Sequence, residues 1–369
     1  MNEQINQTGQ QVMNKDTDTY KCSSCGGQMH FDPRSQVLLC SHCGSKAGVE
    51  VEKRAIREQD LDAAESAGNV NWGMLTRVFH CNNCGAETIL EGNSTAQFCA
   101  FCGSVHVVRY EEAAGIAPEG LIPFKVTRDT AIDNFNRWIK KRFFAPGALK
   151  STYRKQSING AYIPFWSYSA ESDSSYNAEA GTYYYETEQV TVKRDGKDVQ
   201  EQKKVRKTRW RRVSGNFARS FRDHLVNASK QINNRIIARV EPFNLNELAP
   251  YAPGFMAGFL AEKYSVGLQE GWEEARKKMD REIEGGIKAH IGADEVRNLS
   301  VNTNYTNKRY KHLLLPVWIS SYTFNNKIYH FMVNGQSGKV SGDSPVSAGK
   351  VIMVIAAIAA AIALLVWLL

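Results

Sequence analysis

Several familiar signatures are missing from this 369-residue chain, and each absence narrows what the protein can be. The first dozen residues, MNEQINQTGQQV, contain neither a basic segment nor an apolar one, so we expect no secretory signal there. The chain has no HExxH, no GxSxG and no dinucleotide fingerprint after a strand, which argues against the common hydrolase and dehydrogenase classes. No cysteine stands alone, and none lies in a CxxCH haem motif.

A phosphate-binding loop is also missing, although the stretch NGQSGKV at Asn334 invites comparison with one. Val333 and Val340 stand where that motif requires glycine and Ser or Thr. We therefore expect a glycine turn that closes a hairpin between Phe331 and Val340. His290, His312 and His330 have no evident acid or nucleophile partner in the sequence, so the motifs favour a protein without enzymatic activity.

What the chain has is an excess of positive charge. It carries 46 Lys and Arg against 38 Asp and Glu, a net charge of +8. Anionic partners are consistent with this balance, and both nucleic acid and an acidic bilayer surface fit it.

All eight cysteines fall into CxxC pairs. They form two sets of the pattern C-x2-C-x14-C-x2-C, Cys22, Cys25, Cys40 and Cys43, then Cys81, Cys84, Cys99 and Cys102, and the second repeats the first at a constant offset. Two residues between thiolates allow one tight turn to present both sulfurs to a single ion, and the longer spacing allows a hairpin to return the other pair. Glycine follows every pair, as expected where the turn requires φ > 0.

These cysteine sets predict two structural Zn²⁺ ions. A disulfide framework would require an exported N-terminus, and a redox dithiol would occur once beside a βαβ pattern. Four thiolates complete a tetrahedral site and leave no position for substrate, so we expect the ribbons to stabilise the fold and present surfaces. His42 and His80 are adjacent to ligands but are not needed in either set.

The last nineteen residues, Val351 to Leu369, are uncharged and contain neither proline nor glycine. A helix of this length spans roughly 28 Å, close to the hydrocarbon thickness of a bilayer. Lys350 before it and Trp367 near its end suit membrane boundaries. A buried core helix or a cleaved GPI signal fits less well, so we expect a transmembrane tail anchor in the cell membrane. Because the zinc sites need a reducing compartment, the body should be cytoplasmic.

The resulting organisation is an α+β chain with a β-rich α+β body. We expect a flexible N-terminus (1–19), zinc ribbon 1 (20–50), a helical spacer (51–77), zinc ribbon 2 (78–110), a linker (111–121), the body (122–344) and the transmembrane tail anchor (351–369). Within the body, apolar periodicity predicts a helix over 129–144, with Ile132, Phe135, Ile139 and Phe143 on one face, and a longer helix over 265–291. Glu273 with Lys277 and Glu274 with Lys278 should support the exposed side of the longer helix.

Two distant segments of the body resemble each other: IPFWSYSAES from Ile163 and LPVWISSYTF from Leu315. Each places Pro, an apolar residue and Trp at the start of an aromatic strand, which predicts a β-rich body with two halves. The aromatic side chains fit a sheet core better than a ligand platform.

Between these segments, Glu188 to Val213 is strongly basic, and Asp195-Gly196 predicts a hairpin turn. Such a ribbon can enter a nucleic-acid groove, lie on acidic headgroups, dock an acidic protein, or simply protect its own edges from aggregation. The residues predicted to contact an anionic partner are Lys203, Lys204, Arg206, Lys207, Arg209, Arg211 and Arg212.

The sequence resembles the bacterial YdjG-type family in several motifs. These motifs are the four CxxCG knuckles, IPFKV from Ile122, IPFWSY from Ile163, and LPVW through VNGQSGKVSGDSPVS up to the terminal helix. Members of this family are membrane-anchored proteins with TFIIB-type double zinc ribbons, often labelled primosomal-helicase-like, although this chain has no ATPase motor. The resemblance implies a non-enzymatic adaptor on the cytoplasmic side of the membrane in a phage-shock-like stress response, with PspA-type and SPFH-type protein partners. A membrane-tethered nucleic-acid-binding protein is the alternative, and a small-molecule substrate is not expected.

Overall fold

The computed structural model describes residues 20–52, 54–64, 76–81, 87–91, 107–111, 115–146, 158–194, 197–232, 234–324 and 327–368, so the predicted flexible N-terminus (1–19) lies outside it. The strands are β1 (Met29–Asp32), β2 (Val37–Cys40), β3 (Lys46–Ala47), β4 (Gln59–Asp60), β5 (Thr76–Cys81), β6 (Glu87–Glu91), β7 (Val107–Glu111), β8 (Gly120–Leu121), β9 (Asn159–Arg194), β10 (Lys197–Asn227), β11 (Ala249–Pro250), β12 (Leu260–Glu262), β13 (Glu295–Phe324), β14 (Lys327–Asn334) and β15 (Val340–Gly342). The helices are α1 (Arg128–Lys140), α3 (Asn234–Val240), α4 (Leu268–Ile291) and α5 (Ala348–Leu368), with 3-10 turns η3 (Leu245–Glu247) and η4 (Pro253–Met256). The fold is mixed α+β with a sheet-rich body, as predicted.

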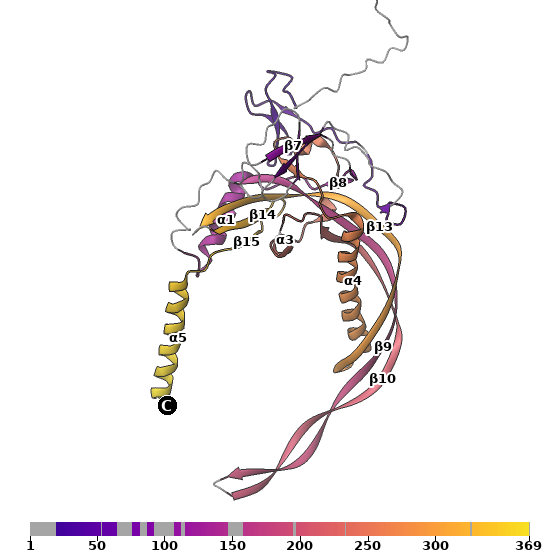
Figure 1. Cartoon of the computed structure of the whole chain (residues 1–369), viewed down its shortest axis with the longest axis vertical. Helices are drawn as coiled ribbons and strands as arrows, with labels where there is room; N and C mark the ends of the chain where they lie inside the picture. Colours follow the sequence, from indigo (N-terminus) through magenta and orange to yellow (C-terminus); the bar gives the residue numbers. More distant parts are fainter. Residues whose placement is uncertain are drawn as a thin grey trace, which may run out of the picture.

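The long strands β9 and β13 form the centre of the body (Figure 1). They are antiparallel, and Ile163 pairs with Leu315, so the two similar segments IPFW and LPVW start at the same pair and run from it in opposite directions. Strands of 36 and 30 residues are far longer than the usual three to ten. Bulges in β10 and β13 interrupt the ladders, and Asp223, Asn298 and Asn307 take positive φ there, which Asp and Asn tolerate. These bulges favour the curvature of the long sheet.

The body contains an internal structural repeat, because a strand–helix–long-strand unit occurs twice. β8 runs parallel to β13, with Leu121 opposite Leu314, and β12 runs parallel to β9, with Ala261 opposite Tyr162. Each short strand leads at the same sequence spacing into a helix, α1 in the first unit and α4 in the second. The two halves predicted from the similar segments are therefore related by an approximate two-fold axis near the Ile163–Leu315 pair.

Side chains in the two units repeat this relationship. The indole N–H of Trp318 donates to the carbonyl of Val126, and that of Trp166 donates to Val266, each at 2.9 Å. Val126 and Val266 lie two residues before α1 and α4. The buried helix positions also match: Ala131, Ile132, Phe135 and Ile139 in α1 correspond to Gly271, Trp272, Ala275 and Met279 in α4. Each unit thus packs its helix on the sheet and fixes the helix start with a buried tryptophan.

The predicted helix over 129–144 is shorter than expected, because α1 ends at Lys140. The N–H groups of Lys141 and Arg142 close the last turn on Arg137 and Ile139, and Phe143 beyond it is 61% exposed. Phe143 is therefore not a core residue. The longer helix matches its prediction closely, but Glu273 pairs with Arg276, and Lys278 donates to the carbonyl of Leu225.

Two connecting segments were predicted wrongly in the parts that the structure describes. The supposed helical spacer forms no α-helix over 51–52 and 54–64. Instead β4 pairs with β13, and the Asp60 side chain accepts from the amides of Asp62 and Ala63, which favours a turn. The supposed linker enters the sheet as β8, where Leu121 is fully buried. Tertiary pairing overrides local composition in both places.

The predicted basic hairpin is present, but its strands are much longer than 188–213. Arg194 pairs with Lys197 around the predicted turn, whose two residues lie outside the described part. β13 begins at Glu295, opposite Gly181, so β9 and β10 continue beyond it as a two-stranded ribbon, hereafter the distal ribbon (Figure 1). The glycine turn after Asn334 is also confirmed, since β14 and β15 pair antiparallel around it.

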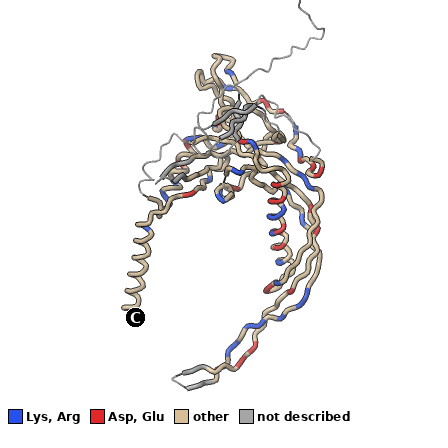
Figure 2. Tube along the Cα trace, viewed as in Figure 1, with Lys and Arg blue, Asp and Glu red and all other residues tan. Residues whose placement is uncertain are grey.

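At the C-terminal end, α5 is an apolar helix of 21 residues with a mean hydropathy of 2.6 over Ala348–Trp367. Its length of about 31 Å and its composition suit a membrane span. Figure 2 shows charges of both signs along α4 and the distal ribbon, whereas α5 carries none beyond its first turn. α5 and the distal ribbon project from the same side of the body (Figure 1).

Candidate metal centre and cationic ribbon

The four cysteines of the first set meet at one point. The sulfurs of Cys22, Cys25, Cys40 and Cys43 all lie within 4.8 Å of one another, and no histidine belongs to this group. Cys22 and Cys43 are 3.5 Å apart at sulfur, and Cys25 and Cys40 are 3.6 Å apart. A disulfide would bring sulfurs to about 2 Å, whereas four thiolates around a tetrahedral Zn²⁺ lie about 3.8 Å apart, given Zn–S bonds of about 2.3 Å. The cluster therefore has the donor set and spacing of a structural metal site.

Local backbone geometry explains why the CxxCG pattern produces this cluster. Gly26 and Gly44 have φ of +72° and +76°, a conformation that glycine adopts without strain. Their N–H groups donate to the carbonyls of Cys22 and Cys40, at 2.8 and 3.0 Å. Each knuckle is a tight turn of the same kind, and β1 and β2 bring the two turns together.

The pKa values of the cysteine thiols depend on nearby backbone amides and on the neighbouring thiols. Backbone hydrogen bonding from Ser24 is the largest effect at Cys22 and lowers its pKa to about 6. At Cys25 the amide of Gly27 lowers the pKa, but the neighbouring thiols and burial outweigh it and raise the pKa to about 12. Four adjacent thiolates repel one another, and a divalent cation among them would relieve this repulsion. These four residues could hold a metal ion.

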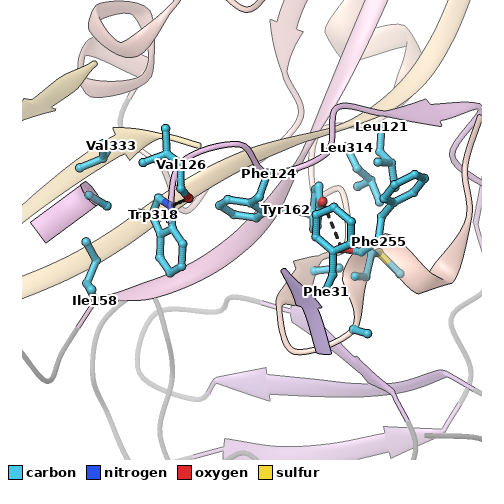
Figure 3. Packing of buried hydrophobic residues seen from close by; sticks show 14 of the residues in the cluster. Phe31, Leu121, Phe124, Val126, Ile158, Tyr162, Phe255, Leu314, Trp318 and Val333 are labelled. Atoms are coloured by element: carbon cyan, nitrogen blue, oxygen red, sulfur yellow. Dashed lines mark hydrogen bonds between the residues drawn. The ribbon is translucent and has the colours of Figure 1, made fainter. Parts of the chain in front are cut away.

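The first ribbon is built into the body and does not stand apart from it (Figure 3). Phe31 of β1 is 1% exposed and lies edge-on to Phe255, and its N–H donates to Ala257 at 2.9 Å. The Gln36 side chain donates to the carbonyl of Phe124 at 2.7 Å. Cys22 and Cys40 belong to the same buried cluster as Phe124. Two of the four clustered cysteines thus share one hydrophobic core with the body.

The second predicted site is only partly described. Cys81 is the last residue of β5, and its side chain, like Cys84, Cys99 and Cys102 as a whole, lies outside the described residues. The backbone of this region forms an antiparallel sheet in which β5 lies between β6 and β7. β6 also pairs with β12, so this region too is connected to the body.

The predicted anion-contact residues divide between two faces of β9 and β10. Residues directly opposite each other in an antiparallel pair share a face. One face carries Lys204 and Arg206 together with Tyr183, Tyr185 and Trp210. Of residues 181–191 and 200–210, those on this face include no Asp or Glu, so we call it the acid-free face. The Arg206 guanidinium stacks 4.3 Å from the centre of the Tyr183 ring. Arg212, beyond Trp210, points to the same side opposite Glu179.

The opposite face is electrically mixed. Lys203, Lys207, Arg209 and Arg211 lie there together with Glu186, Glu188 and Glu201. Lys207 forms ion pairs of 2.6 and 2.7 Å with Glu186 and Glu188, which raise its pKa above the usual range. The sequence alone did not separate these residues; counting alternate positions on each side of Asp195-Gly196 would have done so.

Other ionisable groups of the body are buried and make hydrogen bonds or ion pairs that support the fold. His312 is fully buried, its Nδ1 lies 2.8 Å from the carbonyl oxygen of Ile116, and burial lowers its pKa to about 4. Sequence reasoning missed Lys311, which is nearly buried and pairs with Asp223 and Glu58. Ser167 donates to the same Asp223 carboxylate, and Ser169 donates to Glu58. This network ties the segment after the first ribbon to three long strands.

Together these features define a mixed α+β protein with one apolar C-terminal helix and a four-cysteine cluster at the edge of its core, in which Cys22 and Cys40 are buried and Cys25 and Cys43 are exposed. The chain is 29% identical over 348 residues to an uncharacterized protein of Bacillus subtilis (strain 168), YdjG, and the match covers 90% of this chain and 92% of that protein. No family model matches the chain, and no solved structure matches it. The likeness along nearly the whole length supports a YdjG-like family.

Proposed function

We propose that this chain is a non-enzymatic adaptor, anchored by α5 in the cell membrane, that presents protein-binding surfaces on the cytoplasmic side. Two structural Zn²⁺ ions are held by the eight cysteines. Its partners are PspA-type and SPFH-type proteins of a phage-shock-like membrane stress system. In this proposal the chain belongs to a YdjG-like family of membrane-anchored double zinc-ribbon proteins.

The observation that carries the proposal is that one body holds both the cysteine cluster and the start of the apolar helix. The first ribbon shares its core with the sheet, and Ser347, one residue before α5, donates its N–H to the carbonyl of Phe144 at 2.8 Å. A closed four-thiolate site supplies rigidity rather than chemistry. The body is thus a preformed surface held at a membrane, which is what an adaptor requires.

The distal ribbon is the best placed docking surface. Within the described residues β10 pairs only with β9, so its other edge is open along the ribbon. An open strand edge accepts a strand from a partner, and alternating side chains supply specificity. Thiolate zinc sites persist in reducing compartments, and this chemistry supports the cytoplasmic orientation.

A photocrosslinking experiment tests the adaptor role. The photoreactive residue p-benzoylphenylalanine replaces Tyr185, which is 67% exposed on the distal ribbon, in the full chain in its native membrane. We expect crosslinks to PspA-type or SPFH-type proteins under envelope stress, and none from the same group placed at Glu52, an exposed site near the first ribbon. The adaptor role would be rejected if position 185 gave no protein crosslink. It would also be rejected if positions 185 and 52 crosslinked the same membrane proteins in equal amounts.

A second candidate, membrane-tethered nucleic-acid binding, is favoured by the acid-free face. A two-stranded ribbon fits the major groove, and cations interleaved with aromatic rings suit phosphates and bases. Duplex binding by the detergent-solubilised full chain would then weaken linearly with the logarithm of salt concentration. The double variant Lys204→Gln/Arg206→Gln should reduce that slope by about 1 per lost phosphate contact. Lys207→Gln is the control, because Glu186 and Glu188 already neutralise it. Absence of binding at low salt would exclude this candidate.

A further inference from the structure

The loop of residues 141–146, directly after α1, lies against the first turn of α5. The Lys350 ammonium donates to the carbonyls of Phe143 and Ala145, at 3.0 and 2.7 Å, and lies 5.8 Å from the centre of the Phe143 ring. The Ser347 amide binds Phe144. Segments about 200 residues apart in sequence are thereby joined where the apolar helix begins.

This junction combines exposed aromatic rings with cations. Phe143 and Phe144 are 61% and 41% exposed, although both are large and apolar. Lys140, Lys141 and Arg142 precede them, and the Arg142 guanidinium lies 4.5 Å from the centre of the Trp138 ring. No Asp or Glu occurs in residues 137–146 or after Asp343. We call Lys140, Lys141, Arg142, Phe143, Phe144 and Lys350 the basic aromatic patch.

The patch differs from the distal ribbon in position. The acid-free face of the ribbon also carries cations without acids, but only the patch lies where α5 begins. α5 has no buried residues in its apolar window, so its direction relative to the body is fixed only at its first turn. The charged distal ribbon cannot follow α5 into hydrocarbon, although both project to the same side (Figure 1). In a bilayer the ribbon must therefore stay outside the hydrocarbon that α5 enters, and the patch lies at the start of that helix.

We propose that the basic aromatic patch binds anionic phospholipid headgroups of the bilayer that α5 enters and seats the body on that surface. Lys and Arg near an anionic leaflet gain electrostatic attraction, and aromatic rings partition to headgroup depth. This binding explains why two phenylalanines stay exposed beside an apolar helix. The inference rests on the membrane anchor of the proposed function.

A crosslinking experiment in vesicles tests the patch. The full chain, with p-benzoylphenylalanine in place of Phe143, is reconstituted into phosphatidylcholine vesicles with or without phosphatidylglycerol. We expect phosphatidylglycerol to dominate the crosslinked lipid. The double variant Lys141→Gln/Arg142→Gln should lower that yield about fivefold per lost charge, since each cation near the surface contributes about 1 kcal/mol. The matched control, Lys203→Gln/Lys204→Gln on the distal ribbon, removes the same charge and should leave the yield unchanged.

Vesicle flotation separates failure of the anchor from failure of the patch. If the chain floats with the vesicles but gives no lipid crosslink, or a yield independent of phosphatidylglycerol and of the Lys141/Arg142 charges, the patch proposal is wrong while the anchor stands. The same holds if only the ribbon control lowers the yield. If the chain does not float, both the anchor and the patch are wrong.

Discussion

Phe31 of the first cysteine ribbon lies edge-on to Phe255 of η4, with 5.3 Å between ring centroids and 74° between the planes. Phe31 is 1% exposed, so its ring is a full member of the body's core. Truncation of a buried phenylalanine costs about 3–5 kcal/mol, and we expect Phe31→Ala to lower the free energy of unfolding of the whole body by that amount. Denaturation monitored by tryptophan fluorescence measures the effect. Tyr185→Ala on the distal ribbon should change it by less than about 0.5 kcal/mol. If Phe31→Ala disordered only the first cysteine ribbon and left the body at its normal stability, the cysteine ribbon and the body would be energetically separate.

Metal removal should act in the same way. In the proposed zinc site Cys22 and Cys40 would supply both metal ligands and core surface, so loss of the ion would release the two knuckles and expose part of the shared core. We expect two zinc ions per chain by elemental mass spectrometry, and one in the variant Cys22→Ser/Cys25→Ser. Chelation should lower the melting temperature of the sheet-rich body, and added Zn²⁺ should restore it. A chain that contains no zinc, or a melting temperature insensitive to chelation, would contradict this prediction.

The repeated strand–helix–long-strand unit leads to a prediction about matching tryptophans in its two copies. Trp166 and Trp318 each donate an indole hydrogen bond to the carbonyl two residues before a helix. Replacement by phenylalanine keeps the ring but leaves that buried carbonyl unpaired, at a cost of about 1–3 kcal/mol. Trp166→Phe and Trp318→Phe should therefore destabilise the body to a similar extent. Trp367→Phe, at an exposed position of α5, should not. An effect at only one of the two sites would mean that the symmetry is not matched in energy.

The two tryptophans also show what the sequence could and could not predict. The IPFW and LPVW likeness indicated two halves, and the CxxCG spacing indicated the first cysteine cluster, because both are local patterns with a fixed geometry. Pairing between distant strands left no such local trace. Residues 59–60 and 120–121 enter the sheet only because β13 offers edges at Tyr310 and Leu314. Likewise, Phe143 has the spacing of a residue on the apolar face of a helix. In the structure it lies beyond the helix end, and its carbonyl accepts a hydrogen bond from Lys350, far along the chain.

The buried histidine predicts an acid-sensitive core. His312 is packed between Trp166 and Tyr264, and burial lowers its pKa from 6.5 to about 4. Between these pH values the unfolded chain binds a proton that the folded chain excludes, so the free energy of unfolding must fall as the pH falls through this window. The full loss for one such group is roughly 3 kcal/mol.

His312→Gln keeps a side-chain donor for Ile116 but has no proton to take up. Its stability should therefore decline less steeply from pH 6.5 to 4, as measured by denaturation at each pH. Carboxylates titrate equally in both proteins, so the difference in slope isolates the histidine. The exposed His42→Gln should retain the steep slope, and equal slopes for all three proteins would show that His312 takes up its proton without unfolding.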